Sequence, residues 1–342
     1  MLPLLAVVAF SISLLGVTGV AGAVPGAPPS GKILLGVAGG AATPPQFKQV
    51  TGRRHHIHGV FLGWGQGYTW GKRFPEWMAG AKSGNYRLMI HIDTRKGSSQ
   101  VQTPGSIAGG GGDRYLIAMS KAANSSGQVT YIRPMAEMNG HWNVYSAFNS
   151  NGTRRNAAHS TANYKKAFKR ITLIMRGGDV ANINRRLSTA GMRRLNTGAT
   201  TLPQSGKVAV VWNPQGEGSP NVRGNQPNDY YPGGAFVDYV ANDIYAQNRR
   251  AHWVAHNRLY NKYPGKPFMI AEWAPWGIDD PAFVEAMFRW AASHGRTKAI
   301  VYFNGSAATT FRLGNKPRSL AKYKSFSGQS RYRCDTCNHS TG

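Results

Sequence analysis

The chain has 342 residues, 41% of them hydrophobic and 11% aromatic, and its 41 Lys and Arg against 14 Asp and Glu give a formal net charge of +27. This size allows one large core or two small ones, and the sequence contains no repeat of fixed period. The charge could attract anionic polymers such as acidic polysaccharide or nucleic acid. However, the basic residues are scattered and no nucleic-acid-binding signature accompanies them, so we favour a solvated basic surface and expect no nucleic-acid partner.

The first 24 residues, MLPLLAVVAFSISLLGVTGVAGAV, carry no charged side chain. The small residues Ala21–Ala23 resemble a signal-peptidase site, which predicts a signal peptide over 1–23 and a linker over 24–31. The run is also long enough for a membrane anchor. The cleavage site favours export, so we expect a secreted monomer that has no membrane contact after cleavage.

Eight short apolar runs bounded by turns predict eight strands. They span 32–39, 57–64, 87–93, 129–135, 207–213, 237–245, 267–273 and 298–304. Several are almost continuously apolar, which is typical of parallel strands that are covered on both faces.

Helical patterns lie between most of these runs, at 74–84, 114–127, 161–178, 251–265, 279–295 and 316–326. In the fifth of them Asp280 fits an N-cap and Pro281 the first helical position. The first and fifth connections between strands show no clear helix. Alternating strands and helices predict a (β/α)₈ barrel over 32–328. The competing doubly wound open sheet lacks its glycine fingerprint, since AGGGGDR at 108–114 has neither the lysine nor the hydroxyl residue of a phosphate loop.

The five glutamates differ in where they fall among the predicted strands, helices and loops. Glu76 and Glu285 fall in predicted helices, and Glu217 lies in a Gly/Pro loop after the fifth strand. Glu137 follows strand four and Glu272 ends strand seven, and these C-terminal strand ends meet across the mouth of a barrel. Two carboxyl groups that flank a glycosidic bond are the usual machinery of a glycosidase. The alternative is a structural ion pair, for example between Glu137 and Arg133.

Aromatic residues also gather at the predicted strand ends: Trp64, Trp142, Trp212, Tyr245, Trp273 and Trp276. Flat aromatic faces pack on the apolar faces of sugars, whereas a single tryptophan is more often a core residue. His91, Asp93 and Asp243 lie nearby, but they lack the spacing of a metal motif. We therefore expect no metal and no cofactor, and we expect His91 to contact substrate.

The only two cysteines, Cys334 and Cys337, lie in the tail 329–342. Zinc usually needs four ligands and only His339 is close to this C-x-x-C pair, and the tail does not resemble a redox motif. A small local disulfide is the simplest interpretation.

Several of these segments resemble glycoside hydrolase family 26, the β-mannanase-like retaining enzymes. RPMAEMNGHW (133–142) is similar to the family signature R-P-x-H-E-M-N-G-x-W, YPGGAFVDYVANDIYA (231–246) to its strand-six segment, and PFMIAEWA to its nucleophile segment. FRLGNKPRSLAKYKSF also resembles the usual C-terminal run, so the resemblance covers about 34–328 in the expected order.

The resemblance implies a polysaccharide substrate, most directly β-1,4-mannan, with mixed-linkage β-glucan or β-xylan as alternatives. It makes Glu137 the acid/base and Glu272 the nucleophile, and Tyr245 a residue that hydrogen-bonds the nucleophile. Trp142 would flank the catalytic subsite and Arg133 would support it. Ala136 stands where the family usually has a substrate-binding histidine. This departure, together with the basic charge, keeps open a non-catalytic barrel that binds polysaccharide or polyanion.

Overall fold

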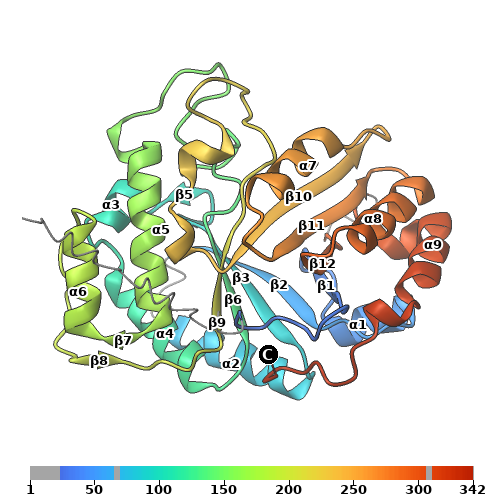
Figure 1. Cartoon of the computed structure of the whole chain (residues 1–342), viewed down its shortest axis with the longest axis horizontal. Coiled ribbons are helices and arrows are strands. Elements are labelled where there is room, and N and C mark those ends of the chain that lie inside the picture. The colour runs from blue at the N-terminus through green and yellow to red at the C-terminus, as the bar shows by residue number, and fades with distance from the viewer. Residues whose placement is uncertain (1–23, 65–69, 306–309, 342) are drawn as a thin grey trace, which may run out of the picture.

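The computed structural model of the protein describes residues 24–64, 70–305 and 310–341, and for 70–73 the backbone alone. The predicted signal peptide lies outside the described residues. Eight parallel strands close into a barrel in the order β1-β12-β11-β10-β9-β6-β3-β2 (Figure 1). They are β1 (Leu34–Ala38), β2 (Ile57–Leu62), β3 (Arg87–Ile92), β6 (Thr130–Pro134), β9 (Val208–Trp212), β10 (Tyr239–Gln247), β11 (Phe268–Trp276) and β12 (Thr297–Phe303). All eight predicted strands and the (β/α)₈ barrel are confirmed.

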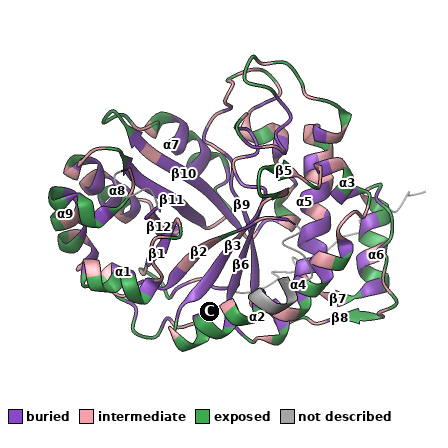
Figure 2. Ribbon diagram, turned by 180° about the vertical axis from the view of Figure 1, so that it is seen from behind, coloured by how far each residue is buried: buried purple, intermediate pink, exposed green. Residues whose placement is uncertain are grey.

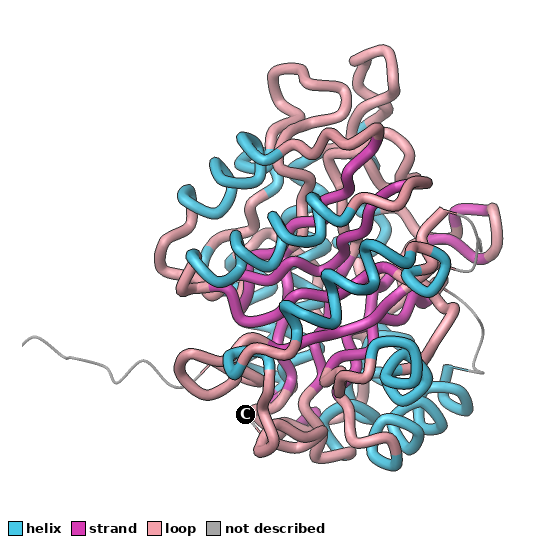
Figure 3. The backbone as a smooth tube through the Cα atoms, turned by 90° about the vertical axis from the view of Figure 1, so that its right-hand side faces the viewer, coloured by secondary structure: helices cyan, strands magenta, loops and turns pink. Residues whose placement is uncertain are grey.

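Helices surround the barrel, as the cyan segments outside the magenta strands show (Figure 3). They are α1 (Pro44–Thr51), α2 (Trp70–Ser83), α3 (Pro104–Ala108), α4 (Asp113–Ser125), α5 (Thr161–Arg176), α6 (Val180–Thr189), α7 (Trp253–Lys262), α8 (Pro281–Ser293) and α9 (Pro317–Ser327). The six predicted helices are confirmed, and the side chain of Asp280 caps α8 by accepting from the backbone N–H of Phe283 at 3.1 Å. The first connection does contain a helix, α1, whereas the fifth has only the 3₁₀ turns Pro227–Tyr230 and Gly234–Phe236.

Two small two-stranded antiparallel sheets lie outside the barrel. The first, β4 (Arg95–Lys96) with β5 (Ser99–Gln100), follows β3. The second lies in the segment after α5, where β7 (Gly178–Asp179) pairs with β8 (Thr201–Leu202) and α6 lies between them. Helix α6 packs through Val180, Ile183 and Leu187, which are buried.

The strands are buried on both faces, which explains their nearly continuous apolar sequence (Figure 2). Because side chains alternate along a strand, two cores form. One lies inside the barrel and includes Met89, Tyr131, Val211, Ala241 and Val301. The other lies between barrel and helices and includes Ile90, Ile132, Val210, Val240 and Ile300.

The N-terminal end of the barrel is covered by the two ends of the described chain. The Arg87 guanidinium, 1% exposed, donates to the backbone oxygens of Gly26 (2.7 Å), Asn338 (2.9 Å) and Thr341 (2.6 Å). Residues predicted as a linker therefore pack on the barrel. The predicted disulfide between Cys334 and Cys337 is present, and both cysteines belong to the inner core. No helix within 24–64, 70–305 or 310–341 is long and apolar enough to cross a membrane.

Candidate active site

The inner face of the barrel changes from apolar to polar at the C-terminal ends of the strands. Alternation from Met89, Tyr131, Val211 and Ala241 brings the next inward positions to His91, Arg133, Asn213 and Asp243. In this way the strand period that builds the apolar core also delivers a layer of polar side chains to the barrel mouth.

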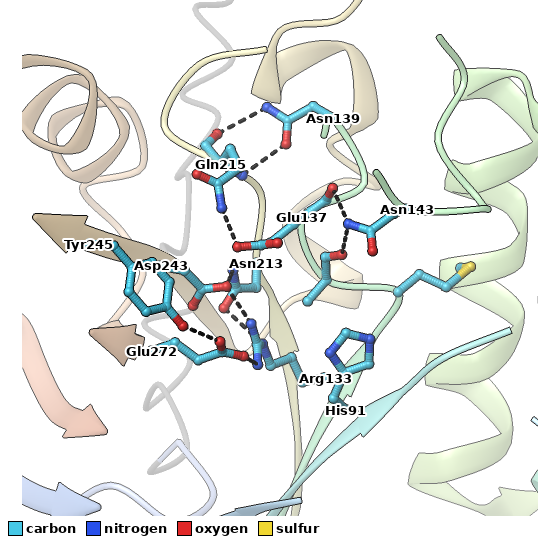
Figure 4. Close-up of polar contacts among 12 residues, drawn as sticks. His91, Arg133, Glu137, Asn139, Asn143, Asn213, Gln215, Asp243, Tyr245 and Glu272 are labelled. Atoms are coloured by element: carbon cyan, nitrogen blue, oxygen red, sulfur yellow. Dashed lines mark hydrogen bonds and ion pairs between the residues drawn. The ribbon is translucent and has the colours of Figure 1, made fainter. Parts of the chain in front are cut away.

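Arg133 lies at the centre of this layer (Figure 4). Its guanidinium, in a side chain 2% exposed, donates to Asn213 Oδ1 at 2.9 Å, to Glu272 Oε1 at 2.5 Å and to Asp243 Oδ2. Asn213 Nδ2 also donates to Asp243 Oδ2 at 3.1 Å. One planar cation thus holds side chains from β10 and β11 and from the residue after β9, which is the geometry that arginine provides and lysine cannot.

Glu272 faces the same centre and has a second donor. The Tyr245 hydroxyl donates to Glu272 Oε2 at 2.6 Å, so each carboxylate oxygen of Glu272 accepts one hydrogen bond. The strand pairing shifts register between Asn242 and Asp243, where Glu272 becomes the partner of Asp243. The predicted contact between Tyr245 and the carboxylate of Glu272 is therefore present.

Glu137 lies just beyond β6 in an unusual backbone conformation. Met135 and Glu137 have φ values of 46° and 54°, which non-glycine residues rarely adopt. The backbone N–H of Glu137 donates to the Asn213 carbonyl at 2.6 Å. The Trp142 indole N–H donates to Glu137 Oε2 at 2.9 Å. Hydrogen bonds to the backbone and side chain of Glu137 thus offset its backbone strain and fix the orientation of its carboxyl group.

Gly140 lets the Trp142 ring reach Glu137. A Cβ atom at position 140 would lie 2.4 Å from a ring carbon of Trp142, so the ring packs directly on glycine backbone. The glycine and the tryptophan of the GHW segment therefore act together: the first makes room for the second.

A second donor to Glu137 was not predicted from the sequence. Gln215, in the loop after β9, donates its side-chain N–H to Glu137 Oε1. The loop is held by Asn139, whose Oδ1 accepts from the Gln215 backbone N–H at 2.8 Å and whose Nδ2 donates to the carbonyls of Gln215 (3.0 Å) and Glu217 (3.1 Å). Asn139 thus links the loop after β6 to the loop after β9. The sequence feature that could have pointed to this link is Asn139, an amide two residues after Glu137, which is fully buried in the structure.

The electrostatics of the cluster are set by three carboxyl groups around one cation. Burial and the neighbouring charge of Glu272 raise the pKa of Glu137, while the hydrogen bond from Trp142 and the positive charge of Arg133 oppose the rise. Burial also raises the pKa of Asp243 well above its usual value, with Arg133 opposing and Glu272 and Glu137 adding to the rise. Although burial opposes it, the charges of Asp243 and Glu272 raise the pKa of Arg133, which stays cationic. Because one cation cannot balance three carboxylates, the cluster favours retention of a proton.

His91 lies at the edge of the cluster as a neutral ring. Burial and the charge of Arg133 lower its pKa well below the usual value. Tyr145 donates its hydroxyl to the Ala136 carbonyl at 2.5 Å and lies 3.3 Å from His91 Nε2. That arrangement places the ring proton on Nε2 and leaves the buried His91 Nδ1, which has no partner among the described residues, as an acceptor.

The aromatic residues divide into a rim and a core. Trp142 (46% exposed) and Trp276 (43%) are accessible to solvent, so their assignment as substrate-binding residues stays a prediction. Trp64 and Trp273 are not accessible: they are 2% and 0% exposed. Trp64 packs against Gly112, and Trp273 packs among Tyr302, Tyr323 and Phe288. Their prediction as substrate-binding residues was therefore wrong, and Trp212, fully buried, is likewise a core residue.

Phenylalanines that the sequence did not reveal complete the rim. Phe61 is 43% exposed and its ring lies 5.4 Å from that of His91 and 6.0 Å from that of Phe303. Phe311 contacts Phe303 (5.1 Å), Tyr245 (5.6 Å) and Trp276 (4.9 Å) between ring centroids. A row of aromatic side chains thus lies beside Glu272.

The remaining acidic candidates have local partners. Glu217 lies 3.0 Å from the exposed His252 imidazole, and Glu285 pairs on the helix surface with Lys322 and Arg289. In the described part of the chain no group of three or more His, Cys, Asp and Glu side chains is arranged to hold a metal ion.

A sequence comparison finds a relative among curated proteins. The chain is 23% identical over 291 residues to "Endoglucanase H" of Acetivibrio thermocellus, a match that covers 81% of this chain and 28% of that protein. The chain therefore spans less than a third of the length of this relative. No family model matches the sequence.

Solved structures share the fold. A modular endo-β-1,4-mannanase of family 26 from Cellulomonas fimi superposes with a TM-score of 0.59 at 15% identity, over 89% of this chain and 72% of that chain. GH26A from Muricauda sp. superposes with a TM-score of 0.56 at 16% identity, over 89% and 91% of the two chains. The predicted resemblance to glycoside hydrolase family 26 is thus confirmed at the level of the (β/α)₈ fold.

Proposed function

We propose that this protein is a retaining glycoside hydrolase that cleaves a β-linked polysaccharide, with Glu272 as nucleophile and Glu137 as acid/base. The observation that carries the proposal is the convergence of these two carboxyl groups around Arg133 at the mouth of a barrel whose fold is that of family 26 enzymes.

Their surroundings suit two different tasks. Glu272 accepts hydrogen bonds from Arg133 and Tyr245, which stabilise the negative charge of an attacking carboxylate. Glu137 has a raised pKa and is only partly buried, whereas Asp243 is 4% exposed beneath it. Burial, and in part a hydrogen bond with Glu137, raise the pKa of Asp243 further still, so we assign one proton to the buried Asp243 and a second to Glu137, where a substrate oxygen can reach it.

The reaction then follows two displacements. Glu272 attacks the anomeric carbon while Glu137 protonates the departing glycosidic oxygen, and a glycosyl-enzyme forms. Glu137, now ionised, takes a proton from water, which attacks the same carbon and releases the sugar from Glu272. The donors Trp142 and Gln215 stabilise Glu137 in this ionised state.

For the substrate we propose β-1,4-mannan first, with mixed-linkage β-glucan and β-xylan as alternatives. The exposed rings of Trp142 and Trp276 would carry sugar rings, and the half-buried His91 would line the subsite beside them. Ala136 offers no side-chain donor beside Glu137, which is the reason that the alternatives remain. We also propose that the protein is exported through its first 23 residues and acts as a monomer.

The test is reducing-sugar release from mannan, β-glucan and β-xylan, with the anomeric configuration of the first product followed by NMR. Wild-type protein should cut at least one polymer with retention, and Glu137→Ala and Glu272→Ala should each lower kcat by a factor of about 10³ or more. Asp243→Asn replaces the third carboxyl group of the cluster by an uncharged amide. Glu285→Ala, at a solvent-facing ion pair, is the control for loss of an acidic residue outside the site. Wild type that binds a glycan without cutting any would leave the non-catalytic barrel as the answer.

A further inference from the structure

One side of the molecule carries many cations and almost no acid. Between positions 161 and 207 the sequence holds ten Lys and Arg and a single acidic residue, Asp179. Asp179 caps α6 by accepting from the Asn182 backbone N–H at 2.6 Å, so its charge is directed to the helix N-terminus. The cations of this segment therefore have little compensation nearby in sequence.

Contacts in the structure join these cations into one surface. Lys166 Nζ donates to the Gly191 carbonyl at 3.3 Å, which brings α5 beside the turn after α6. Lys169 and Arg186 both lie over the ring of Phe236, at 5.2 and 5.4 Å from its centroid. We call this surface the basic face, and it consists of Lys165, Lys166, Lys169, Arg185, Arg186, Arg193 and Arg194.

The basic face rests on a rigid support. The Arg170 guanidinium is fully buried, is held by Asp113 at 2.5–2.7 Å, and donates to the carbonyls of Arg193 (2.7 Å) and Arg194 (3.2 Å). The backbone of the Arg193–Arg194 pair is therefore fixed, while both side chains are exposed. A surface held this way presents its charges without a large loss of loop entropy on binding.

The charges of the basic face are unbalanced. Across the described residues, no salt bridge joins any of its seven cations to a carboxylate. Burial and the nearby charge of Arg176 lower the pKa of Arg186, a sign of cation crowding. Like charges held together destabilise a fold, and an anionic partner would relieve the repulsion.

We propose that the basic face binds an acidic polysaccharide, a polymer of carboxylate-bearing sugars, on the outer side of the barrel at α5 and α6 (Figure 1). Four of the seven cations are arginines, whose planar fork matches a carboxylate. Proteins that bind single-stranded nucleic acid add exposed aromatic rings to their cations, but here Phe236 lies under Lys169 and Arg186, and Tyr164 and Phe168 are buried. This binding does not depend on the proposed hydrolysis.

The test is titration of the full chain with polygalacturonate at low ionic strength, for wild type and the double variants Arg185→Glu/Arg186→Glu and Arg193→Glu/Arg194→Glu. Each double variant should raise Kd about tenfold or more and make Kd less sensitive to salt, since fewer ion pairs form. The matched control is Arg258→Glu/Lys262→Glu, which changes the net charge equally on the exposed face of α7.

Three results would overturn the inference. An equal loss in the α7 control would show that overall charge alone drives binding. Unchanged Kd in both double variants would remove the basic face from the interaction. Tighter binding of duplex DNA than of polygalacturonate through the same arginines would assign the face to nucleic acid. Unfolding midpoints close to wild type would show that the variants are folded.

Discussion

Removing the amide of Gln215 should change how the activity depends on pH. The change is Gln215→Met, which keeps roughly the same side-chain length but deletes the donor to Glu137 Oε1. A hydrogen bond to a charged group contributes about 1.5–3 kcal/mol. Because 1.36 kcal/mol corresponds to one pKa unit, the pKa of Glu137 should rise by about one to two units.

The pKa of Glu137 rises rather than falls because the Gln215 amide stabilises the ionised carboxylate. Gln215 favours ionised Glu137, so its loss raises a pKa that burial and Glu272 already raise. In the proposed mechanism cleavage requires Glu137 to be protonated, so activity should persist to higher pH in the variant. In a plot of kcat/KM against pH, the limb that falls at high pH should move up by about one to two units.

Two further variants make the measurement decisive. Asn139→Ala releases the loop that carries Gln215 and should move the same limb in the same direction, and the double variant should add less than the sum of the two. Gln329→Met, at an exposed position near the barrel floor, should leave the profile unchanged. An active Gln215→Met enzyme whose high-pH limb coincides with that of wild type would refute the reasoning.

Three other changes test the site. Tyr245→Phe removes a donor to Glu272 and should lower kcat/KM about tenfold or more without a shift of the unfolding midpoint; a change in stability alone would argue against a role at Glu272. Gly140→Ala should push the Trp142 ring away and raise KM, whereas Gly265→Ala, which meets open space, should not, and equal KM values in substrate kinetics would contradict this. Arg133→Met should cost about 3–5 kcal/mol in urea unfolding because it strands buried carboxylates, while Arg289→Met at an exposed pair should cost less than about 1 kcal/mol; similar losses would rule out the central role of Arg133.

The sequence was sufficient for the barrel because its strands are buried on both faces and therefore read as apolar runs. It also placed Glu137 and Glu272 at the mouth from strand position alone. Simple alternation would not have turned Glu272 inward, since Met269 and Ala271 already face the inner core. The register shift beside Asp243 resolves this, and such irregularities leave no periodic signal.

Aromatic residues were harder to assign from strand position. Trp64 and Trp273 follow or end strands as Trp142 and Trp276 do, but the first two turn toward the helices and the last two toward solvent. Which way a ring points depends on neighbours far away in sequence, such as Gly112 for Trp64. Gln215 was missed for a similar reason, because its reach to Glu137 depends on the link through Asn139 between two loops.

The contacts of Arg87 bring the two ends of the described chain together on the side away from the mouth. Gly26 and Thr341 give their carbonyls to the same guanidinium, so only a short linker would be needed to join these ends. A circularly permuted chain, or a module fused at either end, would leave the barrel mouth unobstructed. The barrel is thus well suited to immobilisation on a support through its floor.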